Sequence, residues 1–236
     1  GIVLVGTTFA EVVRPDEAQR SWTTINETTV ARTLRFAGSG ERTVVIRLIN
    51  GSIRVSGSDG DTVDLQVRKH IRASSDTSRR EAERDVTLDI ADNAAMVGAI
   101  AREPHGQVCG EPGDGRRGWS WRPQYRVTFD VTVPVPRGTR LALCAVNGGE
   151  IPVEETVGDF QVNHVNGPIA LSGVRGSGYA EAVNGSVAIT FSDTPPAASR
   201  FKTINGDVTV ALPPDASADL AMKTFNGGLF TDFDVQ

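Results

Sequence analysis

Val165-Asn166-Gly167-Pro168-Ile169-Ala170-Leu171 is the stretch that decides the fold. It is an extended run of alternating apolar residues interrupted by an Asn-Gly corner. The same unit (apolar, any, any, apolar, Asn, Gly, any, apolar) recurs along the chain, and its last five asparagines follow one another at intervals of 18 to 21 residues. A fixed period near twenty predicts a repeat architecture. The corner asparagines are Asn50, Asn147, Asn166, Asn184, Asn205 and Asn226.

Two interpretations of the repeat compete. Asn-Gly between alternating strands is a strong hairpin signal and would give an antiparallel meander. A unit that returns once per period instead favours a parallel β-solenoid, in which each coil hydrogen-bonds to the next and equivalent side chains stack. Asn and Gly both tolerate the left-handed region, so the pair also forms a solenoid corner. We favour the solenoid, with a ladder of stacked asparagines along its axis.

The repeat gives each position an expected direction. In the unit around Asn166 we expect Val162, Val165, Ile169 and Leu171 to point into the core. The position three residues before each asparagine is usually polar, so we expect it to face solvent. In the repeat of Asn147 this position holds a cysteine, Cys144.

At this point the chain resembles a known bacterial family, the "putative adhesin" domains of unknown function. These are β-helical envelope proteins with repeated V-N-G-x-I-x-V coils. The resemblance rests on the six repeat units and covers most of residues 30–236; other matching features are Gly158-Asp159, Gly173, Gly176 and the ending Thr231-Asp232-Phe233. It implies a secreted, periplasmic or cell-surface protein whose role is attachment or scaffold assembly.

Composition fits a thin, turn-rich, all-β domain. The chain has 236 residues, 25 of them glycine, and its aromatic content is 6%. The net charge is −5, without a basic excess, and this argues against a nucleic-acid partner. No apolar run is long enough to span a membrane.

The sequence predicts one domain with two interruptions. Residues 1–40 are expected to form N-terminal strands or a cap, and residues 41–236 the solenoid, whose first coil covers residues 43–71. Ser75 predicts the start of a short surface helix over about 75–86, because capping residues there precede a helical pattern. A Gly- and Pro-rich loop is expected over about 102–123.

The first ten residues allow two interpretations. Thr8-Phe9-Ala10 resembles a signal-peptide cleavage site, whereas Ile2–Phe9 also reads as an ordered strand, which we favour. A solenoid exposes unpaired strand edges at its ends. The apolar strand Ile2–Val5 could cover the C-terminal end, either within one molecule or from a neighbour, so self-assembly through the ends is a second hypothesis.

Cys109 and Cys144 are the only two cysteines, and we expect them to form a disulfide, as in an oxidising compartment. Two inert thiols are the alternative. Two cysteines without a nearby histidine do not predict a zinc site.

The sequence predicts no catalytic site and no cofactor. The three histidines have no metal-ligand spacing, and His164 is expected to be packed at a corner or exposed. Carboxylates do not recur in one column, so a degenerate polysaccharide-active enzyme is only an alternative. The best binding candidate lies in the glycine-rich loop, where extended backbone would place two tryptophans on one face as a platform for a sugar ring. The candidate residues are Arg117, Trp119, Trp121 and Arg122.

Overall fold

The computed structural model describes residues 2–5, 22–36, 40–93, 96–104, 109 and 123–233. The described chain is mostly β, with one helix, α1 (Asp76–Asp85). The expected all-β class is therefore confirmed. The sixteen strands that these residues form belong to one hydrogen-bonded network.

The centre of this network is β3 (Arg42–Ser58), which is long enough to belong to two ladders of strands. Its first half lies in ladder A, and its second half, after Asn50, lies in ladder B. Ladder A continues through β8 (Thr139–Asn147), β10 (Phe160–Asn166), β12 (Gly178–Asn184) and β14 (Ser199–Asn205). Ladder B continues through β9 (Ile151–Glu154), β11 (Ile169–Val174), β13 (Val187–Phe191) and β15 (Val208–Ala211).

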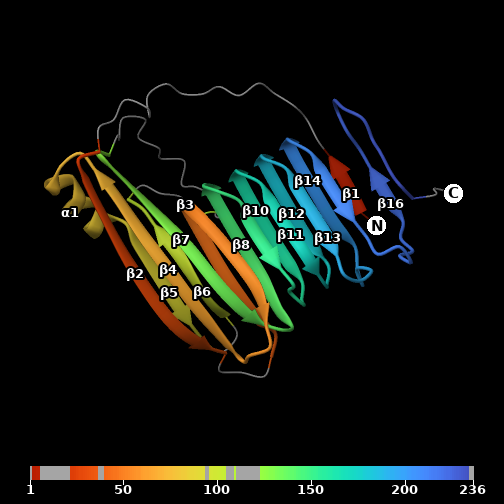
Figure 1. Ribbon diagram of the computed structural model, residues 1–236, viewed down its shortest axis with the longest axis horizontal. Helices are drawn as coiled ribbons and strands as arrows, with labels where there is room; N and C mark the ends of the chain where they lie inside the picture. Colours follow the sequence, from red (N-terminus) through yellow and green to blue (C-terminus); the bar gives the residue numbers. More distant parts are fainter. Residues whose placement is uncertain are drawn as a thin grey trace.

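Successive repeats pair in parallel and in register. In ladder A, Asn166 lies opposite both Asn147 and Asn184, and in ladder B, Ile169 lies opposite both Ile151 and Val187. The antiparallel meander is therefore wrong for residues 139–211. Figure 1 shows the strands of these repeats lying side by side in the right half of the molecule.

The asparagine side chains form the expected ladder along the corners. Each donates from Nδ2 to the Oδ1 of the asparagine one repeat earlier, at 3.2 Å (Asn147 to Asn50), 2.7 Å (Asn166 to Asn147), 2.8 Å (Asn184 to Asn166) and 2.6 Å (Asn205 to Asn184). The first amide, Asn50, donates to the Glu103 carboxylate at 3.0 Å. The amides therefore point the same way, toward a carboxylate at one end.

Glycine is required after the asparagine because the corners stack tightly. Gly167 has φ +156°, and a Cβ there would lie 2.1 Å from Cε1 of His164. A Cβ on Gly185 would lie 2.2 Å from the carbonyl oxygen of Gly167 in the repeat before it. A side chain at Gly185 would force adjacent repeats apart, and a side chain at Gly167 would displace His164 of its own repeat.

The core lies between the two ladders. Val162, Ile169 and Leu171 are buried as expected, but Val165 is only half-buried. Side chains in a strand alternate, so the inward neighbour of Val162 is His164, not Val165. The equivalents of His164 are the buried residues Ala145, Ala182 and Thr203.

The other half of the molecule is partly antiparallel. In ladder B, β7 (Tyr125–Pro136) pairs with β3 in parallel but with β4 (Thr62–Ala73) in antiparallel fashion, and β4 pairs antiparallel with β2 (Thr24–Arg35). In ladder A, β6 (Met96–Arg102) pairs with β3 in parallel and with β5 (Thr87–Asp92) in antiparallel fashion. The prediction that residues 43–71 form a first parallel coil is therefore wrong, because β4 runs back against its neighbours.

Helix α1 agrees with the predicted surface helix. Ser75 is its N-cap, and its hydroxyl accepts a hydrogen bond from the backbone N–H of Ser78. Ala82 is buried, and the helix lies against β4 and β7.

Strand β1 (Ile2–Val5) lies at the far end of ladder A, between β14 and β16 (Leu220–Met222), and is parallel to both. Of the expected N-terminal cap, β2 instead forms the outer strand beside β4. Figure 1 shows β1 and β2 at opposite ends of the molecule.

Candidate ligand-binding surface

The outer face of β4 and β7 carries an open hollow of about 480 Å³. The strands present it because their side chains alternate. Val67, Ile71, Val127 and Phe129 are buried in the core, so the residues between them face outward. The residues that line the hollow are Arg68, His70, Arg72, Arg126, Thr128 and Asp130.

The antiparallel register brings two arginines directly opposite each other. Arg72 is the cross-strand partner of Arg126, and Arg68, four residues earlier on the same face of β4, is the partner of Asp130. Like charges directly opposite on an antiparallel pair are destabilising. The hollow thus concentrates positive charge in a protein whose net charge is −5.

The Glu103 carboxylate, which accepts a hydrogen bond from Asn50, interacts with the charge of Arg126. Burial raises the pKa of Glu103, the hydrogen bond from Asn50 opposes that shift, and the positive charge of Arg126 also opposes it. Glu103 is thus close enough to Arg126 for their charges to interact, and its carboxylate accepts a hydrogen bond from Asn50, the first residue of the asparagine ladder.

Two of the basic residues that line the hollow, Arg68 and His70, lie close to carboxylates. His70 lies between two carboxylates, with Nδ1 3.5 Å from Oε2 of Glu27 and Nε2 3.3 Å from Oδ2 of Asp130. Glu27 also lies 3.4 Å from Nε of Arg68, and Asp130 accepts a hydrogen bond from Ser52 at 2.6 Å. His70 and Arg68 thus have acidic neighbours on β2 and β7.

The rim beside the two arginines is apolar. Ile25 on β2 lies opposite Arg72 and is 71% exposed, one of the few large apolar side chains that the described surface leaves in water. Planar guanidinium groups form paired hydrogen bonds to carboxylate or sulfate, and the apolar body of a sugar ring can pack on an isoleucine. The arrangement can therefore hold an acidic group beside an apolar surface.

A second, acidic hollow of about 330 Å³ lies further along the same ladder. Glu154 and Glu155 line it, together with Ser56, Gly57 and Ser172. Arg54 lies 3.6 Å from Glu154 and offsets part of its charge. Among the described residues there is no group of three or more potential metal ligands.

The tryptophan platform predicted at Trp119 and Trp121, with Arg117 and Arg122, lies outside the described residues. The chain re-enters the structure at Pro123, where Ser74 N–H donates to the Gln124 carbonyl at 3.0 Å, and it continues directly into Arg126. The predicted platform is therefore close in sequence to the hollow.

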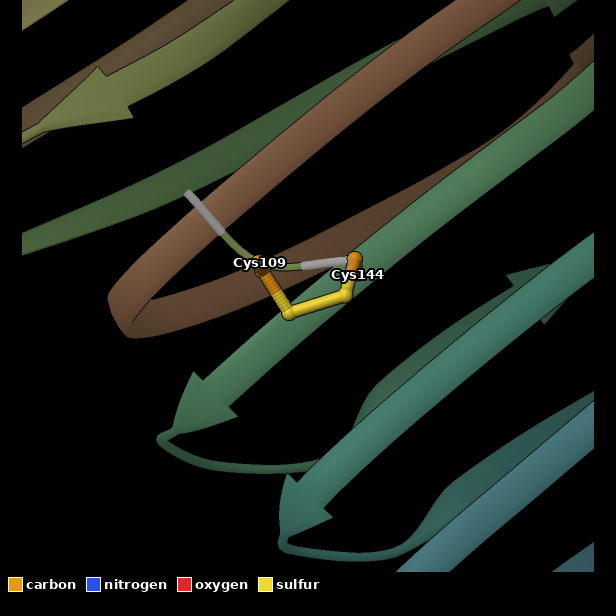
Figure 2. Close-up of a disulfide and its surroundings, with 2 residues drawn as sticks. All are labelled: Cys109 and Cys144. Atoms are coloured by element: carbon orange, nitrogen blue, oxygen red, sulfur yellow. A yellow bond between two sulfur atoms is a disulfide. The ribbon is translucent and has the colours of Figure 1, made fainter. Parts of the chain in front are cut away.

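Cys109 and Cys144 form a disulfide (Figure 2). Cys144 belongs to the outward column, as Arg47 and Asn163 do, yet only 7% of it is exposed. The expectation that this column faces solvent is wrong at this repeat, because Cys109, itself buried, is bonded to it.

His164 is a core residue. Its imidazole is 1% exposed, and Nδ1 lies 3.3 Å from the carbonyl oxygen of Pro168. Burial lowers its pKa, and the hydrogen bond to Pro168 opposes that shift. Of the two places that the sequence allowed, a packed corner or the surface, the structure shows the packed corner.

Sequence reasoning did not find the hollow. Arg68 and Arg72 are separated from Arg126 by more than fifty residues, so no local motif contains all three. The signal that could have found them is the clean alternation in both strands, combined with an antiparallel pairing of β4 and β7.

No family model matches the chain, and no curated protein matches it. Solved structures with some likeness include a "putative cell adhesion protein" from Clostridium sporogenes ATCC 15579, at 10% identity and a TM-score of 0.38, covering 84% of this chain and 100% of that one. A "putative adhesin" from Bacteroides fragilis NCTC 9343 is 9% identical with a TM-score of 0.23, covering 78% and 97%. A "putative lipid binding protein" from Parabacteroides distasonis ATCC 8503 is 8% identical with a TM-score of 0.25, covering 84% and 97%. Scores this low carry no argument about function.

No helix in the described part of the chain is long and apolar enough to cross a membrane.

Proposed function

We propose that the chain is an adhesin-like β-solenoid of the bacterial cell envelope or exterior. Its role is to bind rather than to catalyse, and its ligand is an acidic glycan held in the hollow of β4 and β7. The observation that carries this proposal is the pair of directly opposed arginines, Arg72 and Arg126, with Arg68 on the same face.

An anion held between the two guanidinium groups would offset the repulsion between like charges that face each other on neighbouring strands. Arg72 and Arg126 lie opposite each other across β4 and β7 and both line the hollow, so these are the arginines that we assign to the ligand. Thr128 and Asp130 add a hydroxyl and a carboxylate, which suit sugar hydroxyl groups.

The disulfide supports an oxidising compartment, since disulfides are rare in reducing ones. The solenoid interpretation is supported by the in-register parallel pairing of the repeats and by the continuous asparagine ladder.

A carbohydrate-binding role for Trp119 and Trp121 is the second candidate. It is favoured by closeness in sequence, because Trp121 precedes Arg126 by five residues and Gln124, just before β7, accepts a hydrogen bond from Ser74. The two candidates are compatible, because aromatic platforms bind sugar rings and arginines bind their acidic substituents. A degenerate polysaccharide-active enzyme would instead show turnover of the bound glycan.

Calorimetric titration with acidic oligosaccharides, uronate-containing and sulfated, tests the proposal, and neutral oligosaccharides of the same length serve as the reference. The double variant Arg72→Gln, Arg126→Gln removes the opposed pair. The matched control is Arg140→Gln, Arg200→Gln, which removes two exposed arginines from ladder A and changes the net charge equally.

We expect the site variant to bind acidic oligosaccharides at least about tenfold more weakly, because each charge-assisted hydrogen bond contributes about 1.5–3 kcal/mol and 1.4 kcal/mol is a factor of ten. The control variant should bind within about twofold of the natural protein. Equal losses in both variants would mean that the effect is long-range charge alone. If neutral oligosaccharides bound as tightly as acidic ones of the same length, an acidic glycan would not be the ligand.

A further inference from the structure

Strand β1 interrupts the regular order of the repeats. From β8 to β14, each strand of ladder A is followed by the strand of the next repeat. Strand β14 is instead followed by β1, Ile2–Val5, from the other end of the chain. The strand of the last repeat, β16, pairs with β1 instead of β14.

The register shows that β1 occupies the place of the last repeat. Ile2 lies opposite Ser199 on one side and opposite Leu220 on the other. Ser199 and Leu220 are separated by the same interval as the corner residues Asn205 and Asn226. Without β1, β16 could therefore pair directly with β14 in the register that all earlier repeats use.

The position of β1 between β14 and β16 also interrupts ladder B. A neighbouring strand lies about 4.8 Å away, so β16 is displaced by one such spacing, and the segment after Asn226 starts too far from β15 to join it. Residues 228–231 accordingly form no strand, and among the described residues β15 pairs only with β13.

The side chains of the last repeat are exposed for the same reason. Leu229 belongs to the inward column of Ile169 and Val187, which are 1% and 0% exposed, yet Leu229 is 50% exposed. Phe225, before the corner, is 74% exposed, whereas its equivalents Val165 and Val183 are half-buried. The last repeat thus carries apolar residues of the repeat pattern, but these side chains are exposed instead of packed.

We propose that the outer edge of β14 is a strand-acceptor site with two competing occupants from this chain, Ile2–Val5 and the last repeat, Leu220–Thr231. The site binds a short, extended, apolar peptide by parallel backbone pairing, and its occupant in this structure is Ile2–Val5. When this peptide leaves, β16 moves onto β14, residues 228–231 extend ladder B beside β15, and Leu229 is buried.

Cross-linking distinguishes the two occupants because it reads the spacing between β14 and β16. Arg200 and Ala221 are both exposed, and both lie opposite Val3. With β1 between them, their Cα atoms are about two strand spacings apart, roughly 9.6 Å, too far for a disulfide. In direct contact they would be about 4.8 Å apart, within the range of a disulfide.

The experiment uses the variant Arg200→Cys, Ala221→Cys, with and without Val3→Pro, which removes one ladder hydrogen bond and disfavours β1 as a strand paired on both sides. A second variant, Val3→Cys, Arg200→Cys, reports β1 in place. Cross-links are read by mass spectrometry of peptides after mild oxidation, which also separates them from the natural disulfide of Cys109 and Cys144.

We expect the 3–200 cross-link in the otherwise natural chain. The 200–221 cross-link should be scarce there and rise at least about fivefold with Val3→Pro, and added peptide of the sequence of residues 1–6 should lower it again. Hydrogen exchange of residues 228–231 should slow when Val3→Pro is present. The proposal would be overturned if Val3→Pro left the yield of the 200–221 cross-link unchanged. It would also be overturned if the variant Val3→Cys, Arg200→Cys gave no 3–200 cross-link.

Discussion

The asparagine ladder should stabilise the stack of repeats, and Asn166→Ala tests this most directly. Asn166 donates to Asn147 at 2.7 Å and accepts from Asn184 at 2.8 Å, so the substitution removes two hydrogen bonds at once. One intramolecular hydrogen bond contributes about 0.5–1.5 kcal/mol net, which gives about 1–3 kcal/mol for two. Asn166 is exposed, so water can satisfy the groups left behind, and we expect about 1–2 kcal/mol.

The assay is unfolding in urea, with the free energy of unfolding taken from the midpoint and slope. The matched control is Asn163→Ala, three residues earlier on the same strand. In the described part of the structure, the Asn163 side chain makes no hydrogen bond. The control should cost less than about 0.5 kcal/mol, as surface substitutions usually do.

A double-mutant cycle with Asn184→Ala separates the ladder from any local effect. Each single substitution removes two ladder bonds, but they share the bond between Asn166 and Asn184, so the double variant loses three bonds instead of four. Its cost should therefore fall short of the sum of the single costs by about 0.5–1.5 kcal/mol. Strict additivity, or a control as damaging as Asn166→Ala, would refute a hydrogen-bonded ladder.

Three further outcomes are expected. Because burial raises the pKa of Glu103 above its ordinary 4.5, the folded state holds this proton more tightly, so stability should fall as pH rises from about 4.5 through the folded pKa, and Glu103→Gln should flatten urea midpoints there. His164 has the opposite sign: burial lowers its pKa below 6.5, so stability should fall as pH drops below 6.5, and His164→Ala should remove that dependence in the same titration. Replacing Cys109 and Cys144 with alanine opens a loop of 35 residues and should cost about 2–4 kcal/mol in urea; a change below about 0.5 kcal/mol would contradict this.

The repeats could be predicted from the sequence because one residue type returns at one structural place. The in-register pairing of Asn147, Asn166, Asn184 and Asn205 agrees with the period near twenty, which favours stacked repeats over an antiparallel meander. The inward direction predicted for Val165 is wrong because the alternation of β10 turns its neighbour His164 into the core instead. The residues equivalent to His164 in the repeats of Asn147, Asn184 and Asn205 are alanine or threonine. Their small side chains are the sequence signal that this position points into the core.

The antiparallel half could not be predicted in the same way. Nothing in residues 62–73 distinguishes a strand that continues a coil from one that turns back, since both alternate apolar and polar residues. The pairing partners β2, β4 and β7 are distant in sequence, so the hollow formed by Arg68, Arg72 and Arg126 exists only after the fold has chosen their register.

The two halves of the molecule therefore suit different tasks. Stacked repeats align outward side chains in columns where opposite charges can pair, as Lys202 and Glu181 do at 2.6 Å. Such neutralised columns stabilise the stack and leave little unbalanced charge for a ligand. The antiparallel strands have no such stacked columns, and there Arg72 and Arg126 lie directly opposite each other, an arrangement that like charges disfavour. Replacing Arg72 with glutamine should accordingly raise the free energy of unfolding slightly, by a few tenths of a kcal/mol, while weakening ligand binding, and a loss of both would show that the arginine is structural.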